Sequence, residues 1–258
     1  MQNTFIFDFD DTLYSHPLKR VPESAKRSLQ QLTALGHHII VATGRGAEAA
    51  EMICTEIGME PKLMIMMNGQ VILEQGQVVY ENHIALPSMT QILVLAQEND
   101  YACGGYYPQG TLVDRVNERV NAVWRDFSAR LPDIIPDFPE QAPLYQGHLY
   151  VSAAEEALFP LGDYVLNRSH RFLLNLIPRD AGKGQAIHWC AERYGFDVLD
   201  TYAFGDGIND CSMLAAVGHP VAMGEAPAEL QAVAEYVTGT AAEDGIELAL
   251  LHFGILTP

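Results

Sequence analysis

Three carboxylates follow the first strongly apolar run of the chain. Phe5-Ile6-Phe7 is followed by Asp8, Asp10 and Asp11. Asp8 and Asp10 are two residues apart on what we expect to be an extended segment, so their side chains should leave the same face. Two carboxylates about 4 Å apart repel each other by roughly 4 kcal/mol at an effective dielectric constant near 20. Such a pair requires a cation or a shared proton.

Further polar clusters come where later strands are expected to end. One follows the apolar run HHIIVA, a second follows KLMIMM, and a third is the segment GDGIND at residues 205 to 210. The candidate residues outside the first cluster are Thr43, Gly44, Arg45, Asn68, Lys183, Asp206, Asn209 and Asp210. Open parallel sheets bind ligands outside the carboxyl ends of their strands, at the switch in strand order. We therefore expect these side chains to surround one site.

The donor types in these clusters favour phosphoryl transfer. Oxygen ligands suit Mg²⁺, which readily shares phosphate oxygens, and the lack of His or Cys nearby in sequence argues against zinc. A metal beside Lys183 and the Thr43 hydroxyl would make a phosphoryl-transfer site. Asp8 can then act as the nucleophile and form an aspartyl-phosphate. Asp10 can protonate the leaving alcohol and later take a proton from the hydrolytic water.

Alternating strand and helix patterns at both ends of the chain would position these residues. After the opening strand we expect a helix from Pro22 to Gly36, a strand ending near Thr43, a helix from about Ala47 to Gly58, and a strand over KLMIMM. Residues 181–258 resume the pattern with a helix, a strand over TYAFGD, further short elements and a terminal helix. The predicted fold class is α/β, with a Rossmann-like parallel sheet.

The middle of the chain has a different composition. Residues 79–180 are richer in aromatic residues and proline, and they contain no lysine, seven arginines and thirteen acidic residues. Two helical patches are expected, at residues 89–100 and 116–131, among short alternating strands. We predict an inserted α+β cap domain at 79–180, with residues 1–78 and 181–258 completing one core.

Composition limits the possible partners. The 258 residues include 15 basic and 33 acidic ones, for a net charge of −18, which disfavours non-specific binding to nucleic acid or anionic membranes. No apolar run approaches membrane-spanning length, and the N-terminus lacks a signal-peptide pattern. We expect a cytoplasmic protein, a monomer or weak homodimer, with a small phosphorylated molecule as its partner.

The motifs resemble those of a known family. DFDDT (8–12), TGR (43–45), Lys183 and GDGIND (205–210) resemble the four ordered motifs of the haloacid dehalogenase-like (HAD) phosphatases. The segment from GDGIND to IELAL, and NGQVI before the insert, resemble the Cof-type subfamily with a C2-type (C2B) cap. This resemblance implies a Mg²⁺-dependent phosphatase that acts on small phosphomonoesters, such as sugar phosphates, nucleotides or phosphorylated vitamins.

The resemblance also implies a role for each matching residue. Asp8 would be the nucleophile and Asp10 the general acid/base. Mg²⁺ would be held by Asp8, the backbone carbonyl of Asp10, and Asp206, with Asp210 in support. The phosphate would be held by the Phe9 amide, Thr43, Gly44, Lys183 and Asn209. Arg45 could reach a substrate phosphate or connect core and cap, and Asn68 is a further candidate. Asp11 departs from the subfamily, where Gly is often found, and we expect it to adjust the turn and the local charge.

Two other functions fit parts of the sequence. GRGAEA (44–49) matches a relaxed G-x-G-x-x-A fingerprint, which is typical of a Rossmann-type NAD(P)-binding oxidoreductase. However, the next strand ends in Asn68 and not in the acidic residue that would bind a ribose. A non-enzymatic phosphoacceptor signalling domain also uses acidic residues, Mg²⁺, Thr and Lys. Its acceptor Asp would follow the third strand, where this chain has Asn68.

Overall fold

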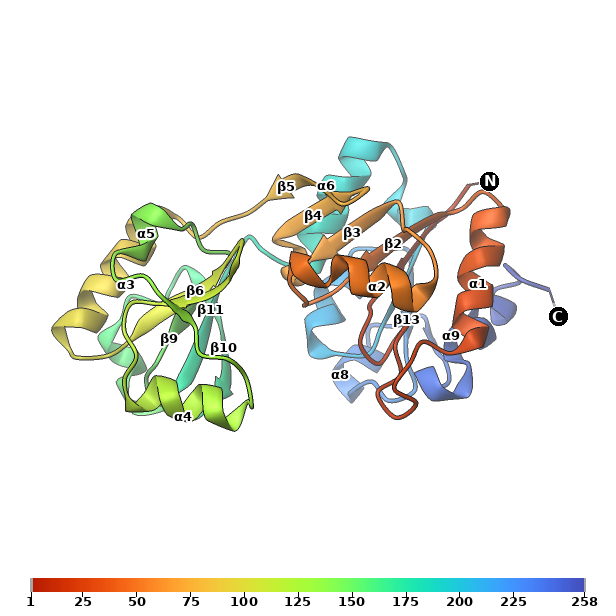
Figure 1. Cartoon of the computed structure of the whole chain (residues 1–258). Helices are drawn as coiled ribbons and strands as arrows, with labels where there is room; N and C mark the ends of the chain where they lie inside the picture. The colour runs from red at the N-terminus through yellow and green to blue at the C-terminus, as the bar shows by residue number, and fades with distance from the viewer. Residues whose placement is uncertain (1, 258) are drawn as a thin grey trace. The chain divides into compact units, whose positions relative to one another are not determined.

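The computed structural model describes residues 2–257, and the chain divides into two compact units (Figure 1). The core unit consists of the residues up to Glu81 and those from Ala181 onward, and the inserted unit is Asn82–Asp180. The expected boundary after residue 78 falls inside strand β5 (Gln77–Glu81), which belongs to the core unit. The chain returns to the core unit after Asp180.

One eight-stranded sheet runs through the core unit. In spatial order its strands are β14 (Tyr236–Val237), β13 (His219–Ala222), β12 (Thr201–Gly205), β1 (Thr4–Phe7), β2 (His38–Ala42), β3 (Leu63–Met66), β4 (Val71–Glu74) and β5. The strands from β14 to β3 are parallel, whereas β4 and β5 form an antiparallel hairpin at one edge. The predicted Rossmann-like α/β fold class is confirmed, and the hairpin is an addition that the sequence pattern did not predict.

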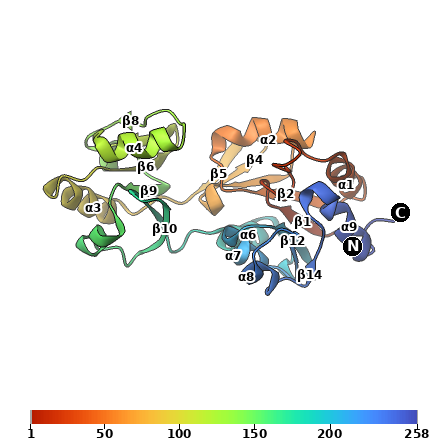
Figure 2. The same cartoon turned by 90° about the horizontal axis from the view of Figure 1, so that it is seen from below.

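Helices cover both faces of the core sheet. Figure 2 shows α1 and α2 on one face and α6, α7 and α8 on the other. The helices are α1 (Glu23–Ala34), α2 (Ala50–Ile57), α6 (Lys183–Tyr194), α7 (Cys211–Leu214), α8 (Ala228–Gln231) and α9 (Gly245–His252). Short 3₁₀ turns are η1 (Ala47–Ala49), η2 (Met67–Gly69), η4 (Val198–Asp200), η5 (Ile208–Asp210) and η6 (Ala241–Glu243).

Strand β1 lies in the middle of this core. Its four residues are all buried, as expected for a parallel strand covered on both faces. Ile6 packs in the cluster that includes Ile187 and Leu214 from the helices on one face. Phe7 stacks on Phe204 of the neighbouring strand with ring centroids 4.8 Å apart. The end of β1 is therefore held firmly, and the residue after it, Asp8, starts from a rigid position.

The inserted unit is built on a second sheet of six strands. In spatial order these are β10 (Tyr164–His170), β11 (Leu173–Pro178), β9 (Gln146–Leu149), β6 (Cys103–Tyr107), β7 (Gly110–Val113) and β8 (Asp133–Ile134). The helices are α3 (Leu86–Glu98), α4 (Glu118–Asp126) and α5 (Phe138–Gln141), with a 3₁₀ helix η3 (Ala153–Leu158). Both expected helical patches are present, α4 being shorter than its patch. The unit is α+β, with its own buried clusters.

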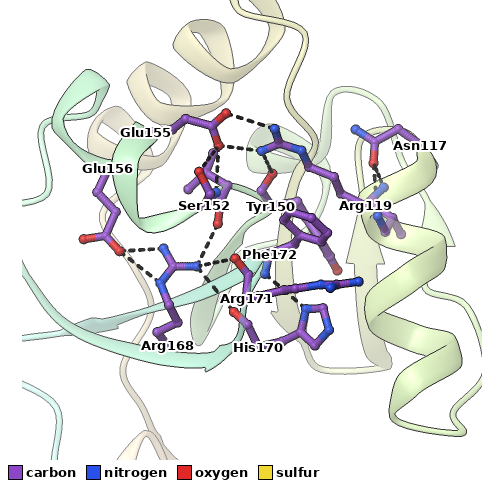
Figure 3. Close-up of polar contacts among 12 residues, drawn as sticks. Asn117, Arg119, Tyr150, Ser152, Glu155, Glu156, Arg168, His170, Arg171 and Phe172 are labelled. Carbon is purple, nitrogen blue, oxygen red and sulfur yellow. Dashed lines mark hydrogen bonds and ion pairs between the residues drawn. The ribbon is translucent and has the colours of Figure 1, made fainter.

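Arginine side chains are used for internal pairing in the inserted unit (Figure 3). Arg119 donates two hydrogen bonds, of 2.6 and 2.9 Å, to the Glu155 carboxylate, and these hold the pKa of Glu155 well below its usual range. Glu155 also closes a capping box with Ser152 at the start of η3. Arg168 makes a similar pair with Glu156, at 2.5 and 3.1 Å. These pairs connect strands and helices within the unit.

Candidate active site

The predicted site residues lie in loops at one edge of the core sheet. Strand β1 stands between β12 and β2, and later strands extend the sheet in both directions from it, so this is the switch in strand order. A pocket of about 270 Å³ lies there. Its lining residues are Asp8, Asp10, Asp11, Gly44, Arg45, Asp206, Gly207 and Asn209. Loops after three different strands, β1, β2 and β12, thus contribute to one pocket.

Lys183 is fully buried beside this pocket. Its Nζ lies 2.5 Å from Oδ1 of Asp8 and 2.6 Å from Oδ1 of Asp210. Burial raises the pKa of Asp8 well above its usual range, against the effect of Lys183 and with that of Asp210. Burial acts to lower the pKa of Lys183, but the two carboxylates outweigh it and leave that pKa above its usual value. The ammonium is thus held charged between two acidic groups.

Asp206 completes a group of three acidic side chains. Asp8, Asp206 and Asp210 each place a carboxylate oxygen within 4.8 Å of the others, which would suit a bound metal ion. Asp206 is oriented by the Thr12 hydroxyl, which donates to its Oδ1 at 3.1 Å. Burial, reinforced by the charge of Asp210, raises the pKa of Asp206 to about 6. A cation at this point would relieve the repulsion among these groups.

The donor set fits a hard divalent cation. Asp210 already accepts from Lys183 through Oδ1 and from the backbone N–H groups of Asp206 and Gly207 through Oδ2, at 3.0 Å each. It therefore organises the loop more than it offers ligand atoms. Asp8 and Asp206 have a carboxylate oxygen each that these contacts do not use. With all three carboxylates ionised, the group with its one ammonium has a charge of −2, which a divalent cation would balance.

Asp10 lies differently from the prediction. Strand β1 ends at Phe7 and a turn follows, so Asp8 and Asp10 are not on one extended segment. Both line the pocket, but the Asp10 carboxylate accepts from Arg45, with Nε at 2.8 Å and Nη2 at 2.5 Å. The extended segment assumed in the prediction is therefore absent, although both residues line the one pocket, and the Asp10 carboxylate is bound by Arg45. Arg45 thus contacts Asp10, an interaction not predicted from the sequence.

Thr43, Gly44, Asn68 and Asn209 lie together around the next loops. The fully buried Thr43 accepts from the Arg45 backbone N–H through its hydroxyl, at 3.1 Å. Asn209 donates from its side chain to Oδ1 of Asn68 at 3.1 Å, joining the loops after β3 and β12. A side-chain carbon on Gly44 would lie 3.3 Å from that same oxygen. Asn68 therefore supports two of the expected phosphate-binding positions.

Some site residues were not predicted from the sequence. Thr12 belongs to the DFDDT motif, but its hydrogen bond to Asp206 joins residues 194 positions apart in the sequence. The two residues meet because strands β1 and β12 are neighbours in the sheet. His16 approaches Asp10 from a loop without any periodic pattern, with 3.6 Å between Nε2 and Oδ1. The buried ring of Phe9 lies under the Arg45 guanidinium, 4.9 Å from the ring centroid to Cζ. The expected contact of the Phe9 amide with phosphate remains a prediction.

The sequence matches a family model over most of its length. Residues 5–250 match the model described as haloacid dehalogenase-like hydrolase. The chain belongs to the haloacid dehalogenase-like hydrolase family. The family assignment made from the four motifs and the expectation of a hydrolase are confirmed, and the family implies a divalent metal. The match supports neither the oxidoreductase nor the phosphoacceptor alternative.

Relatives of this family cover the whole chain. The protein named "Putative phosphatase YkrA" of Bacillus subtilis (strain 168) is 34% identical over 264 residues, 97% of each chain. The structure of the HAD phosphatase BT1666 from Bacteroides thetaiotaomicron aligns with a TM-score of 0.86 and 29% identity, covering 99% of this chain and 96% of that one. The HAD subclass IIB sugar phosphatase BT4131 aligns at 0.80 and 27%, over 99% and 100%. Among residues 2–257 of the present chain, none of the helices has the length and apolar character to cross a membrane.

Proposed function

We propose that this hydrolase is a Mg²⁺-dependent phosphatase that acts on small phosphomonoesters through an aspartyl-phosphate at Asp8. The observation that supports this most is the charge balance around Lys183. Asp8 and Asp210 contact this buried ammonium, Asp206 places a carboxylate oxygen within 4.8 Å of theirs, and the group has a charge of −2 when all three acids are ionised. Asp8 and Asp206, with the Asp10 backbone carbonyl, would hold the metal, and Asp210 would support them. Bound Mg²⁺ would orient a phosphate group and neutralise part of its charge.

Asp8 would act as the nucleophile. One of its carboxylate oxygens forms a bond to phosphorus while the bond from phosphorus to the ester oxygen breaks. Lys183 already contacts Oδ1, and its positive charge offsets the charge that builds on the transferring group. Water then attacks phosphorus, the bond to Asp8 breaks, and inorganic phosphate leaves. Both carboxylate oxygens of Asp8 are thus restored at the end of the cycle.

Asp10 would move the protons of both steps. It gives a proton to the leaving alkoxide in the first step and takes one from the attacking water in the second. Its carboxylate reaches the pocket wall, where Arg45 binds it in the conformation observed. The phosphate oxygens would be held by Thr43, Gly44, Asn209 and the Phe9 amide. Each of these groups belongs to a loop that follows a strand of the core sheet.

The inserted unit, residues 82–180, would act as the cap that selects the leaving group. Core loops contact the phosphoryl group, which is common to all phosphomonoesters, so they provide little discrimination among substrates. A relative of this fold is a sugar phosphatase, and we propose sugar phosphates as the first class to test. Nucleotides and phosphorylated vitamins are the other compatible classes. A screen of phosphorylated metabolites with purified enzyme would rank them.

A phosphate-release assay with an activated aryl phosphate tests the proposal. We expect turnover with Mg²⁺ and its loss in excess chelator. Asp8→Asn should remove turnover while the melting temperature shows a folded protein. Asp100→Asn, at a side chain 96% exposed in the inserted unit, is the matched control and should retain activity. Turnover without metal, or a normally active Asp8→Asn protein, would refute the assigned site.

A further inference from the structure

Asp11 has an unusual backbone conformation beside Asp10. Its φ of +53° lies in the left-handed region, which disfavours most residues other than Gly, Asn and Asp. Gly adopts this backbone conformation without steric cost, so this chain has a side chain where the turn needs none. Strain of this kind near a site is a reason to ask what the side chain does.

The Asp11 carboxylate holds His16 at two points. Oδ1 accepts from the His16 backbone N–H at 3.1 Å, and Oδ2 lies 3.0 Å from ring Nδ1. The ring also packs edge-on against Tyr14, with centroids 5.4 Å apart. The orientation of a histidine ring is set by the partner of one nitrogen, which decides where the other nitrogen points. Here the other nitrogen, Nε2, faces Oδ1 of Asp10 at 3.6 Å.

The turn itself does not require the Asp11 carboxylate. Backbone hydrogen bonds already close it, from Asp11 N–H to the Tyr14 carbonyl at 2.8 Å and from Tyr14 N–H to the Phe9 carbonyl at 2.7 Å. Ser15 N–H continues the loop with a 3.0 Å bond to the Arg20 carbonyl. The side chain of Asp11 therefore serves contacts beyond the turn, and those described above are to His16.

We propose that Asp11 and His16 are positioning residues for Asp10. Arg45 binds the Asp10 carboxylate through two nitrogens, and Nε2 of His16 lies 3.6 Å from Oδ1 of the same carboxylate. Asp11 keeps the His16 ring in that place, so the carboxylate is confined where it lines the pocket. This rests on the proposed function, because Asp10 is assigned there as the group that protonates the leaving alcohol.

The inference predicts a loss that depends on the leaving group. An alkyl phosphate needs a proton at its leaving oxygen, whereas a nitrophenyl phosphate leaves as a stable anion. Asp11→Gly and His16→Gln should each lower kcat/KM for an alkyl phosphate about 5- to 20-fold and for 4-nitrophenyl phosphate by less than about twofold. The ratio kcat/KM is suited to this test because it includes the steps up to ester cleavage and not the later hydrolysis of the aspartyl-phosphate.

Folding and activity controls make the result decisive. Gly adopts the backbone of residue 11 without strain, so the melting temperature of Asp11→Gly should equal or exceed that of the parent. Asp11→Asn retains a carbonyl oxygen for the His16 N–H and tolerates this φ, so it should recover part of the alkyl phosphate activity. His188 is exposed on α6, so His188→Gln should leave kcat/KM unchanged for both the alkyl phosphate and 4-nitrophenyl phosphate.

Two outcomes would overturn the inference. One is an equal loss on both substrates, which would mean general damage to the site, and the other is no loss on either. Failure of the proposed function would look different, because the parent enzyme itself would then lack Mg²⁺-dependent turnover of 4-nitrophenyl phosphate.

Discussion

Replacing Lys183 by Met would test the charge balance of the site without any substrate. Met has a similar length and volume, so packing around α6 should be retained, but Asp8 and Asp210 would lose the ammonium that lies 2.5 and 2.6 Å from them. Removing one partner of a buried ion pair costs about 3–5 kcal/mol. Because whole domains are stable by only about 5–15 kcal/mol, a large part of the stability of the core unit should disappear.

A double variant separates charge from packing. Asp8→Asn alone leaves Lys183 with its contact to Asp210 and removes a carboxylate whose pKa is raised by burial, so it should change the stability of the core unit little at pH 7. Asp8→Asn combined with Lys183→Met removes one negative and one positive charge, and replacing both members of a buried pair is often close to neutral. The double variant should therefore lose less than the sum of the two single losses, with a coupling energy of about 2 kcal/mol or more.

The two tryptophans allow each unit to be followed alone. Trp189 lies in α6 of the core unit, and Trp124 lies in α4 of the inserted unit. In a Trp124→Phe background, fluorescence during urea unfolding at pH 7 with chelator present reports on the core unit. Added Mg²⁺ should then raise the urea midpoint of Lys183→Met more than that of the parent, because its carboxylate group is more negative. A loss below about 1 kcal/mol for Lys183→Met, or additive losses in the cycle, would refute this account of the site.

Three further outcomes follow from the described contacts. Burial lowers the pKa of His148 to about 3, so on acidification the unfolded chain takes up a proton that the folded inserted unit does not. Stability is thus intact above about pH 6.5 and falls by about 2 kcal/mol from pH 7 to pH 5, and urea titrations of His148→Phe should lack that slope. Gly69→Ala should lower the free energy of unfolding by about 2–4 kcal/mol, because the new side-chain carbon would lie 2.3 Å from the Gly182 carbonyl oxygen. Gly76→Ala, where the new carbon meets open space, should lower it by about 1 kcal/mol. Equal losses in thermal unfolding would contradict this difference. Arg119→Lys cannot keep the two-point contact with Glu155 and should cost the inserted unit about 1 kcal/mol by fluorescence-monitored unfolding, and an unchanged midpoint would show that the pair contributes nothing.

The sequence predicted the parallel strands and the meeting of the motifs for one physical reason. Buried parallel strands are continuous apolar runs, and three of these runs are followed directly by a polar residue, as Phe7 is by Asp8, Ala42 by Thr43 and Gly205 by Asp206. Parallel strands bring their carboxyl ends to one edge, so clusters far apart in sequence meet. Lys183 could be included among the predicted site residues because it begins the helix that leads into strand β12 of this sheet.

The hairpin was not predicted because its second strand, β5, lacks that pattern. Strand β5 is mostly exposed, with Val78 51% and Val79 37% accessible, so it shows no buried periodicity. Its two-residue turn has Gln75 and Gly76 at positive φ, +49° and +72°, and only the second of these is a residue type that typically indicates such a turn. The predicted domain boundary therefore fell inside the strand.

The orientation of the Asp10 side chain could not be predicted from the sequence, for a different reason. Which way a side chain points after a strand depends on the backbone angles of the next few residues. Here strand β1 ends at Phe7 and Asp10 lies in the turn that follows, where its carboxylate accepts from Arg45. Spacing predicted Asp10 as a candidate reactive residue, while its contacts are made in a loop without periodicity.

Some departures from local preference lie at this edge of the sheet. Lys183 is the first residue of α6, where the positive end of the helix dipole disfavours a cation, and the residue before it, Gly182, offers no capping side chain. Met67 and Asn68 are both left-handed, at φ +52° and +54°, as is Asp11. Asn and Asp tolerate that conformation, but Met67 does not favour it and Lys183 opposes the dipole of its helix, so the stability lost there must be recovered elsewhere in the core unit. Lys183 contacts Asp8, which lines the pocket, so a residue that opposes its local structure is found where the proposed function needs its charge.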